Sequence, residues 1–316
     1  MKLVFCGTPR FAVPTLEALL AAGHEIALVV SQPDRPVGRA QQLGAPPVKV
    51  AAQAAGLAVT QPEKIRNNAE FRAQLEELAP EAIVVVAYGR ILPPWMLALP
   101  RLGCINLHAS LLPKYRGAAP IQWAVAKGEA FTGNTTMLLE EGLDTGPILL
   151  ERALAIGPEQ TAADLFEELA VGGAPLVVET LAGLDDGSLQ PQPQYHLGAT
   201  LAPILTREDG RMGFAAHTAA ELKNRWRGFQ PWPGAFTVVN GKKLIVHRMA
   251  IAHESCAARL GFAEPGRILV ENDRLLAACA ENTWLEFLEV QLEGKKRLGA
   301  AEFLRGNPLA ADARLG

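Results

Sequence analysis

The sequence predicts an α/β fold with a doubly wound, mainly parallel sheet in its N-terminal part, followed by a small β-barrel. Residues 1–183 alternate apolar runs with helical patterns, which is typical of helices layered around a parallel sheet. Residues 185–206 lose the apolar periodicity and alternate proline with glutamine, as extended, semi-rigid linkers do. From about Ala219 onward, short strands separated by turn signals replace the helix–strand alternation.

Continuous apolar runs identify the strands of the parallel sheet, because such strands are buried on both faces. The β-branched run 82–87 is the clearest example. The expected strands are 2–6, 25–30, 58–59, 82–87 and 103–108, with a hairpin of 134–139 and 148–156. Helical spacing predicts helices over 11–22, 46–55, 70–78, 119–126 and 161–181. This order predicts a Rossmann-like sheet, in which ligands bind beyond the carboxyl ends of the strands.

The C-terminal strands are short and punctuated by turns. The pair Asn240-Gly241 is a strong hairpin signal. After a short helix at 222–226, strands are expected over 235–239, 244–250, 266–270, 274–278 and 284–290. Such closely spaced short strands predict an OB-like β-barrel, a type that binds oligonucleotides. The expected division is an α/β domain (1–184), a linker (185–206) and an OB-like domain (207–316).

Composition and charge exclude several classes of protein. The chain has 316 residues, 49% hydrophobic and 20% charged, so a globular core is expected. It shows no secretory signal pattern and no uninterrupted apolar run of membrane-spanning length. Four cysteines without CxxC spacing argue against a zinc site or disulfide framework and favour a cytoplasmic location. Residues 1–206 carry 14 Lys+Arg against 20 Asp+Glu, whereas residues 207–316 carry 16 against 13, which allows an anionic ligand on the C-terminal part.

Asn106, His108 and Asp144 are the strongest candidates for chemistry. Asn106 and His108 are two residues apart in an expected strand, so their side chains share one face. Asp144 stands between Gly142 and Gly146, in a turn that can bring it back to His108. An amide donor, an imidazole and a carboxylate that orients the imidazole suit acyl transfer. The alternatives are satisfied core polar residues and an aspartate that only forms a turn; two polar side chains on one apolar strand favour function.

Two loops that follow the first strands carry weaker signals. The turn Gly7-Thr8-Pro9 lacks the GxGxxG pattern, and Pro9 has no backbone donor, so a nucleotide-dependent oxidoreductase is disfavoured. The segment 32–42 holds two prolines, a glycine and two arginines. It is expected to be a loop that either contacts phosphate or is simply solvated.

Taken together, these segments resemble the methionyl-tRNA formyltransferase family over the whole chain. The resemblance is carried by Phe-Cys-Gly-Thr-Pro (5–9), Gln-Pro-Asp-Arg-Pro-Val-Gly-Arg (32–39), 86–93, 106–122, Glu-Gly-Leu-Asp-Thr-Gly (141–146) and Phe-Gln-Pro-Trp-Pro-Gly (229–234). The Asn-x-His pair with the aspartate alone would mark only the wider group of folate-dependent formyl transferases and hydrolases. The 32–39 loop and the C-terminal module make the resemblance specific.

The resemblance implies transfer of a formyl group from 10-formyltetrahydrofolate to the α-amino group of methionine on initiator tRNA, for translation initiation. Asn106, His108 and Asp144 are then the catalytic residues. Asn106 and His108 are expected to hydrogen-bond the developing oxyanion, and Asp144 to orient His108 and help remove the proton of the amine. No metal is implied. The expected folate contacts are Ser110, Leu111, Leu112, Pro113, Val86, Tyr88, Gly89 and Ile91.

The resemblance also implies contacts with tRNA, made by the 35–42 loop, the linker and the barrel. The expected residues are Arg35, Arg39, Gln41, Gln42, Arg207, Arg225, Lys242 and Lys243. Gln41 and Gln42 are neutral where the family pattern suggests lysine, and Ile204 stands where a basic residue is expected. These departures concern the strength of RNA binding and leave the chemistry intact. A monomer without membrane contact is expected.

Two other functions stay open at this point. A formyltransferase that acts on a sugar-nucleotide amine would share the same three catalytic residues. A catalytically silent RNA-binding protein that uses the barrel would be expected to lack at least one of them, and all three are present.

Overall fold

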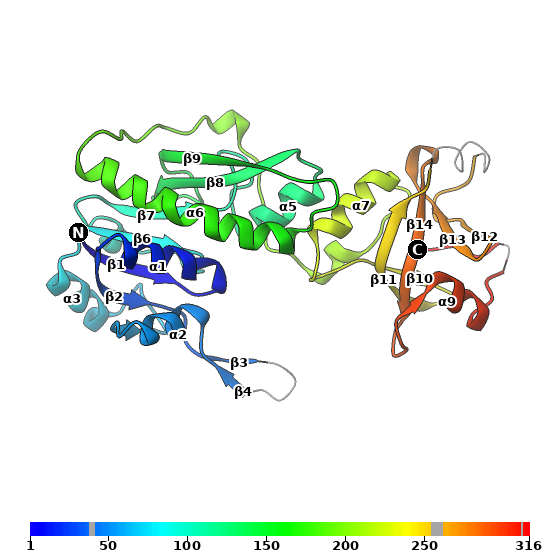
Figure 1. Cartoon of the computed structure of the whole chain (residues 1–316), viewed down its shortest axis with the longest axis horizontal. Coiled ribbons are helices and arrows are strands. Elements are labelled where there is room, and N and C mark those ends of the chain that lie inside the picture. The colour runs from blue at the N-terminus through cyan, green and yellow to red at the C-terminus, as the bar shows by residue number, and fades with distance from the viewer. Residues whose placement is uncertain (38–41, 254–261, 311) are drawn as a thin grey trace. The chain divides into compact units, whose positions relative to one another are not determined.

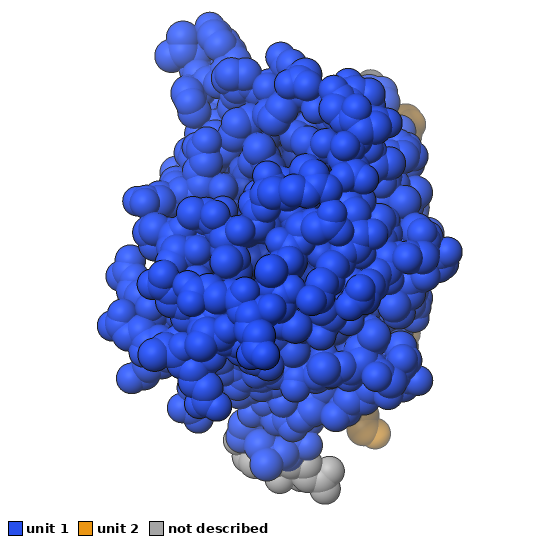
Figure 2. Space-filling view, turned by 90° about the vertical axis from the view of Figure 1, so that its left-hand side faces the viewer, with its two compact units in different colours: residues 1–120, 131–155, 164–203 blue, residues 121–130, 156–163, 204–316 orange. Residues whose placement is uncertain are grey.

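The computed structural model describes residues 1–37, 42–253, 262–310 and 312–316. Within it the chain forms two compact units. Unit 1 comprises residues 1–120, 131–155 and 164–203, and unit 2 comprises 121–130, 156–163 and 204–316; Figure 2 shows one face of unit 1 in blue. The short segments 121–130 and 156–163 thus belong to unit 2, although residues of unit 1 flank them. The domain boundaries expected at 184 and 207 stay a proposal.

Unit 1 is built on a seven-stranded sheet (Figure 1). From edge to edge its strands are β5 (Val59–Thr60), β2 (Glu25–Val30), β1 (Lys2–Gly7), β6 (Ala82–Val86), β7 (Cys104–His108), β8 (Phe131–Leu138) and β9 (Ile148–Ala155). The pairs from β5 to β7 are parallel, and β8 and β9 extend the sheet as antiparallel strands. The predicted mainly parallel sheet and the predicted hairpin are therefore confirmed.

The strand order reverses direction at β1. From β1 the chain proceeds to β2 and β5 on one side, and it later returns to β6 and β7 on the other side. The connections therefore leave the carboxyl ends of β1 and β6 in opposite directions, which opens a crevice for ligands at that edge. The candidate catalytic residues lie at this edge, because β7 ends at His108.

Helices join the parallel strands and complete the core. They are α1 (Val13–Ala21), α2 (Pro47–Ala54), α3 (Ala69–Leu78) and α4 (Pro94–Leu97). The helix α6 (Ala162–Asp185) follows β9, and α5 (Pro120–Ala126), which follows β7, lies almost wholly in unit 2. Phe71 of α3 and Met96 of α4 are buried in one cluster with Ile83 of β6. The short helix α4 was not predicted from the sequence. It begins at Pro94, whose fixed φ suits a first helical turn. No described helix is long and apolar enough to cross a bilayer.

Two adjacent glycines of α6 test how tightly this helix packs on the sheet. A Cβ on Gly172 would meet no atom within 4 Å, whereas a Cβ on Gly173 would lie 2.7 Å from Leu107 Cδ2 and 3.2 Å from Asn134 Cγ. We expect Gly172→Ala to raise the free energy of unfolding by about 0.5–1 kcal/mol, because alanine is the better helix former. Gly173→Ala should lower it by about 1–3 kcal/mol through overpacking. Denaturant titration measures both free energies of unfolding. Equal values for the two variants would contradict the close contact at Gly173.

The segment after β2 is more ordered than the loop expected there. Residues Arg35–Val37 (β3) and Gln42–Gly44 (β4) pair as antiparallel strands on either side of residues 38–41, which lie outside the described part. Asp34 precedes this hairpin and accepts hydrogen bonds from Lys49 Nζ at 2.8 Å and Gln61 Nε2 at 2.7 Å. The hydrogen bond from Lys49 is the main reason that the pKa of Asp34 is lowered. The base of the hairpin is therefore held by long-range contacts that local propensity does not encode.

The segment after α6 contains one 3-10 helix (His196–Gly198), and its backbone pairs with other parts of unit 1. Gln192 bridges to Ile148 at the start of β9, and Leu201 bridges to Arg116. The Ala119 N–H donates to the carbonyl of Ala202 at 3.1 Å. The linker residues up to 203 are thus part of the unit that carries the candidate catalytic residues.

Unit 2 holds a six-stranded antiparallel sheet. Its strands follow the order β10 (Phe236–Val239), β11 (Lys242–Ile251), β14 (Trp284–Leu292), β13 (Arg274–Ala278) and β12 (Ile268–Glu271), with β15 (Leu298–Gly299) beside β14. Asn240 and Gly241 join β10 to β11 with φ values of 49° and 71°, as a tight hairpin turn requires. Register shifts bend β11. The predicted OB-like fold is confirmed as a curled antiparallel sheet.

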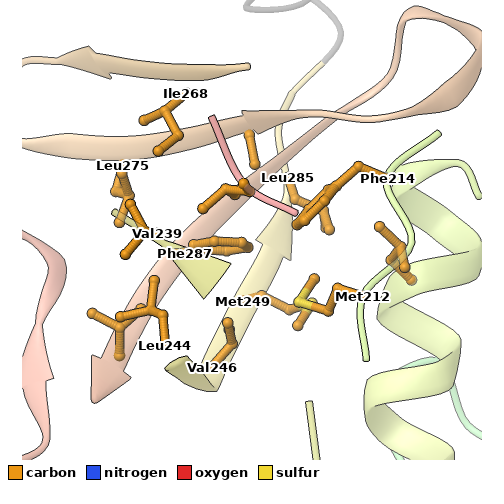
Figure 3. Packing of buried hydrophobic residues seen from close by; sticks show 14 of the residues in the cluster. Met212, Phe214, Val239, Leu244, Val246, Met249, Ile268, Leu275, Leu285 and Phe287 are labelled. Atoms are coloured by element: carbon orange, nitrogen blue, oxygen red, sulfur yellow. The ribbon is translucent and has the colours of Figure 1, made fainter. Parts of the chain in front are cut away.

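One apolar cluster fills this curled sheet (Figure 3). Phe287 is 0% exposed and lies in the middle of it, with Val239, Leu285 and Met249 around its ring. The helices α7 (Ala219–Gly228) and α9 (Ala300–Gly306) complete the unit. The first of these helices was predicted from its sequence pattern. The second, α9, was not, and its seven residues bury mainly Phe303. A helix this short carries little periodic signal.

Candidate active site

Asn106 and His108 lie on one face at the carboxyl end of β7, as predicted. In the register with β8, Asn106 is opposite Met137 and His108 is opposite Thr135. His108 is only 5% exposed, whereas Asn106 is half-buried. The strand therefore presents an amide and a nearly dry imidazole at the edge where the sheet can bind a ligand.

A backbone carbonyl determines how the His108 ring is used. His108 Nε2 lies 2.9 Å from the carbonyl oxygen of Tyr115. Because a carbonyl oxygen only accepts, this contact assigns the ring hydrogen to Nε2. Tyr115 has a φ of 62°, and its N–H donates to Thr200 Oγ1 at 2.8 Å. The ring nitrogen that this contact leaves without the hydrogen is Nδ1.

Asp144 lies beside that free nitrogen. Its Oδ2 is 3.8 Å from His108 Nδ1, too far for a hydrogen bond but close enough to stabilise a charge on the ring. The same Oδ2 accepts a hydrogen bond from the Gly117 N–H at 2.8 Å, and Asp144 has a φ of 50°. The structure thus brings Asn106, His108 and Asp144 together, with the Tyr115 carbonyl as the hydrogen-bonding partner of the imidazole.

The loop after His108 is held in place by Thr135 of β8. Leu112 N–H donates to Thr135 Oγ1 at 3.1 Å, and Thr135 Oγ1 donates to the Ser110 carbonyl at 2.7 Å. Ser110 Oγ donates to the Lys114 carbonyl at 2.7 Å. Ser110 and Leu112 are buried, whereas Leu111 and Pro113 are half-buried. Of the four expected folate contacts in this loop, Ser110 and Leu112 shape the backbone, whereas Leu111 and Pro113 offer apolar surface.

The segment after β6 offers mainly backbone and one apolar side chain. Val86 and the Tyr88 ring are buried, and burial raises the pKa of Tyr88. Gly89 is exposed with a φ of 78°, and the Ile91 side chain is 83% exposed. Among the expected folate residues of this segment, Gly89 and Ile91 are therefore the accessible ones.

Sequence reasoning missed the polar residues that support this segment. The Tyr88 carbonyl accepts hydrogen bonds from Thr8 Oγ1 at 3.2 Å and Gln32 Nε2 at 3.1 Å, and Gln32 Oε1 accepts one from Arg90 Nε at 3.0 Å. The sequence did carry a signal for these residues, because Thr8 and Gln32 come within two residues of the ends of β1 and β2. Polar side chains at the carboxyl ends of parallel strands converge on one edge of the sheet.

The expected tRNA contacts in the hairpin of unit 1 are only partly described. Arg35 is exposed in β3. Arg39 and Gln41 lie outside the described residues, and of Gln42 only the backbone, in β4, is described.

The expected tRNA contacts in unit 2 differ in accessibility. Arg207 is exposed at the start of a 3-10 helix (Arg207–Gly210), and Lys242 is exposed at the β10–β11 turn. Lys243 Nζ lies 3.8 Å from the centroid of the Phe236 ring.

Arg225 is engaged within unit 2. Its guanidinium lies 5.0 Å from the centroid of the Phe229 ring and donates to the Asp209 carbonyl at 2.9 Å. Burial lowers the pKa of Arg225. These contacts suit a structural arginine better than a phosphate contact.

The described residues contain no group of three or more His, Cys, Asp or Glu side chains placed to hold a metal ion. Cys6, Cys104 and Cys279 are free, buried thiols, and Cys256 lies outside the described part. Burial raises the pKa of Cys104 to about 12. Thiols in such surroundings are poor nucleophiles.

Two family models match the chain. The model described as Formyl transferase matches residues 1–181, and the model described as Formyl transferase, C-terminal domain, matches residues 204–308.

Curated relatives match over the full length. A methionyl-tRNA formyltransferase of Acidobacterium capsulatum is 66% identical, and the match covers 100% of both chains. The methionyl-tRNA formyltransferase of Koribacter versatilis is 57% identical over 99% of this chain and 98% of that one. That of Solibacter usitatus is 50% identical over 100% and 99%.

Solved structures share the fold at low identity. The sugar 3N-formyl transferase WlaRD has a TM-score of 0.64 at 16% identity, covering 94% of this chain and 99% of that chain. HypX from Aquifex aeolicus, solved in complex with tetrahydrofolic acid, has a TM-score of 0.59 at 17% identity, covering 96% of this chain and 47% of that chain.

Proposed function

This chain belongs to the methionyl-tRNA formyltransferase family, and we propose that Asn106, His108 and Asp144 carry its reaction. It formylates the methionine of initiator tRNA for translation initiation. One observation carries this conclusion: the 66% identity to a methionyl-tRNA formyltransferase extends across all 316 residues. Because the identity includes the C-terminal domain, it supports the tRNA acceptor as well as the formyl-transfer reaction.

The formyl donor is folate-based, and we propose 10-formyltetrahydrofolate. When bound, it supplies a formyl group on an activated nitrogen, so no covalent enzyme intermediate is needed. The exposed Ile91 and the half-buried Leu111 and Pro113 provide apolar surface at the carboxyl ends of β6 and β7. The backbone around Gly89 provides polar groups beside them.

Asn106 and His108 stabilise the charge that develops on the formyl oxygen. The Asn106 amide is half-buried and carries two N–H donors. His108 uses Nε2 to donate to the Tyr115 carbonyl, so Nδ1 donates to the formyl oxygen only after it has taken up a proton. Donors already held in place in a nearly dry site stabilise an oxyanion more effectively than water does.

Asp144 and His108 together handle the protons. The α-amino nitrogen loses one proton when it becomes an amide, and the donor nitrogen gains one when its bond to the formyl carbon breaks, so the exchange balances. The Asp144 carboxylate can accept the first proton, and His108 Nδ1, at 3.8 Å from Asp144 Oδ2, can exchange protons with both nitrogens. No metal is required for either step.

The acceptor is proposed to contact both units through exposed basic residues. Arg35 in β3 and Arg207 and Lys242 in unit 2 are exposed, and residues 207–316 carry 16 Lys+Arg against 13 Asp+Glu. Cationic side chains that meet phosphates contribute affinity without reading sequence. We expect a monomer that works in the cytoplasm, where translation initiation takes place.

One experiment tests this function against its rivals. Purified protein with 10-formyltetrahydrofolate is offered methionyl initiator tRNA, methionyl elongator tRNA and a sugar-nucleotide amine, and formylated product is measured. Selective formylation of the initiator is expected. Formylation of the sugar amine alone would keep the catalytic site and overturn the acceptor, and binding of tRNA without any transfer would favour the silent RNA-binding protein.

Replacing Lys242 and Lys243 by alanine should weaken tRNA use without altering chemistry. We expect KM for tRNA to rise while kcat stays unchanged, because lost phosphate contacts remove electrostatic binding. The slope of log KM against log salt should fall by about one per lost contact. Lys64→Ala, at an exposed position of unit 1, serves as the control. An unchanged salt slope in the double variant would remove the β10–β11 turn from the interface.

A further inference from the structure

Gln194 is a buried polar residue in an otherwise exposed stretch of the linker. It is 6% exposed, whereas its neighbour Tyr195 is 70% exposed and Pro193 is also exposed. A glutamine side chain is buried only where its amide finds partners, because leaving it unpaired is costly. The partners of Gln194 come from two segments that flank the catalytic imidazole.

The side-chain amide of Gln194 satisfies its full hydrogen-bonding capacity. Nε2 donates to the carbonyls of Asp144 at 2.9 Å and Gly146 at 2.7 Å. Oε1 accepts from Arg116 Nε at 3.1 Å and also from Arg116 Nη2. This network fixes the amide orientation, since the flipped amide would face two carbonyls with its oxygen and a guanidinium with its nitrogen.

These contacts join the two sides of the His108 ring. Arg116 directly follows Tyr115, whose carbonyl holds His108 Nε2. On the other side of the ring, Asp144 faces Nδ1. One linker side chain therefore ties the residue after Tyr115 to the backbone of Asp144.

Thr200 acts on the same loop from further along the linker. Its Oγ1 accepts the Tyr115 N–H at 2.8 Å, and its carbonyl accepts the Arg116 N–H at 2.9 Å. Tyr115 and Asp144 have φ values of 62° and 50°, which are unfavourable for residues other than glycine and persist only where surrounding contacts impose them.

We propose that Gln194 and Thr200 are positioning residues for the formyl transfer: they hold Tyr115 and Asp144 on opposite sides of His108. This inference rests on the proposed function. Neither side chain needs to touch substrate, and the linker becomes a working part of the active site. A small displacement of the imidazole or the carboxylate lowers the rate without weakening substrate binding.

Gln194→Glu separates this role from a purely structural one. The carboxylate can keep its contact with Arg116 as an ion pair, but it cannot donate to the carbonyls of Asp144 and Gly146. We expect kcat to fall about 10- to 100-fold, with KM for folate and for tRNA unchanged, in a protein that still folds but unfolds at a lower temperature than the wild type. The pH profile of kcat should change, because Asp144 would no longer be held beside Nδ1.

Gln192→Glu is the matched control. It places the same charge two residues earlier, where the exposed Gln192 side chain donates to the Gln190 carbonyl at 3.3 Å. Its kcat, pH profile and unfolding temperature should equal those of the wild type. Thr200→Val is the second variant, at an exposed position where the fold should tolerate it, and it should also lower kcat with KM unchanged.

Nitrogen NMR of His108 gives a readout that does not depend on the acceptor. The wild type and Gln192→Glu should show the Nε2–H form, and Gln194→Glu and Thr200→Val should shift the ring signals. Wild-type kcat and ring signals in both Gln194→Glu and Thr200→Val would overturn this inference. An inactive wild type whose ring signals still respond to Gln194→Glu would overturn the function and keep the positioning role.

Discussion

Replacing His108 by alanine is expected to lower kcat by about 10³-fold or more, and Asn106→Ala by about 10²–10³-fold. In the proposed mechanism, the His108 variant loses the proton exchange at Nδ1 and the oxyanion donor that a protonated Nδ1 provides, whereas the Asn106 variant loses a donor alone. Both side chains lie at the end of β7, so their removal leaves the strand pairing intact. The Tyr115 carbonyl loses its partner in the His108 variant, which costs about 1–3 kcal/mol of stability at most.

Single-turnover kinetics with saturating folate and methionyl initiator tRNA measures both losses. His247→Ala is the control, because His247 lies in β11 of the other sheet, where Nε2 contacts Gln291 Oε1 at 2.8 Å. It should keep the wild-type rate. Unfolding temperatures of all variants show that the losses are not caused by unfolding. Full activity in folded His108→Ala would sink the catalytic assignment.

Gly146→Ala is expected to destabilise the fold by about 3 kcal/mol or more and to reduce activity at temperatures where it remains folded. A Cβ at this position would lie 1.9 Å from the Leu138 carbonyl oxygen. Because the obstacle is backbone of β8, relief requires the turn that carries Asp144 to move. The Gly146 carbonyl also accepts from Gln194, so the displacement would reach the Asp144 carboxylate.

Gly142→Ala is the matched comparison on the same turn. Its Cβ would meet the Thr145 side chain, with Oγ1 at 2.2 Å, and that side chain can rotate away. We expect a loss of about 1 kcal/mol or less. Denaturant titration together with kcat measures both variants. Similar stabilities for the two would show that the turn is free to shift at Gly146.

Features that depend on short-range pattern were predictable from the sequence. The apolar run of β6 predicted a buried strand. The two-residue spacing of Asn106 and His108 predicted that both side chains share one face of the following strand. The glycines around Asp144 predicted a turn. The Asn240-Gly241 hairpin followed from the positive φ values that these residues tolerate.

Features that depend on long-range contact were not predictable. The Tyr115 carbonyl carries no side-chain signal, so its hydrogen bond to His108 Nε2 could not be read from residue types. Gln194 is 50 residues from Asp144 along the chain. The alternation of glutamine and proline around it is typical of a solvated linker. The hairpin of β3 and β4 contains Pro36, which disfavours a strand except at an edge.

The pairing of residues 192–202 with unit 1 also decides where the polypeptide can be shortened. A fragment that stops at the end of α6, Asp185, would shed Gln194 and Thr200 together with the bridges to Ile148 and Arg116. The turns around Tyr115 and Asp144 would then become the first places for a protease to cut. A fragment that continues to Pro203 keeps all of these contacts. A fragment that is meant to keep the turns around Tyr115 and Asp144 therefore has to continue about eighteen residues beyond the end of α6.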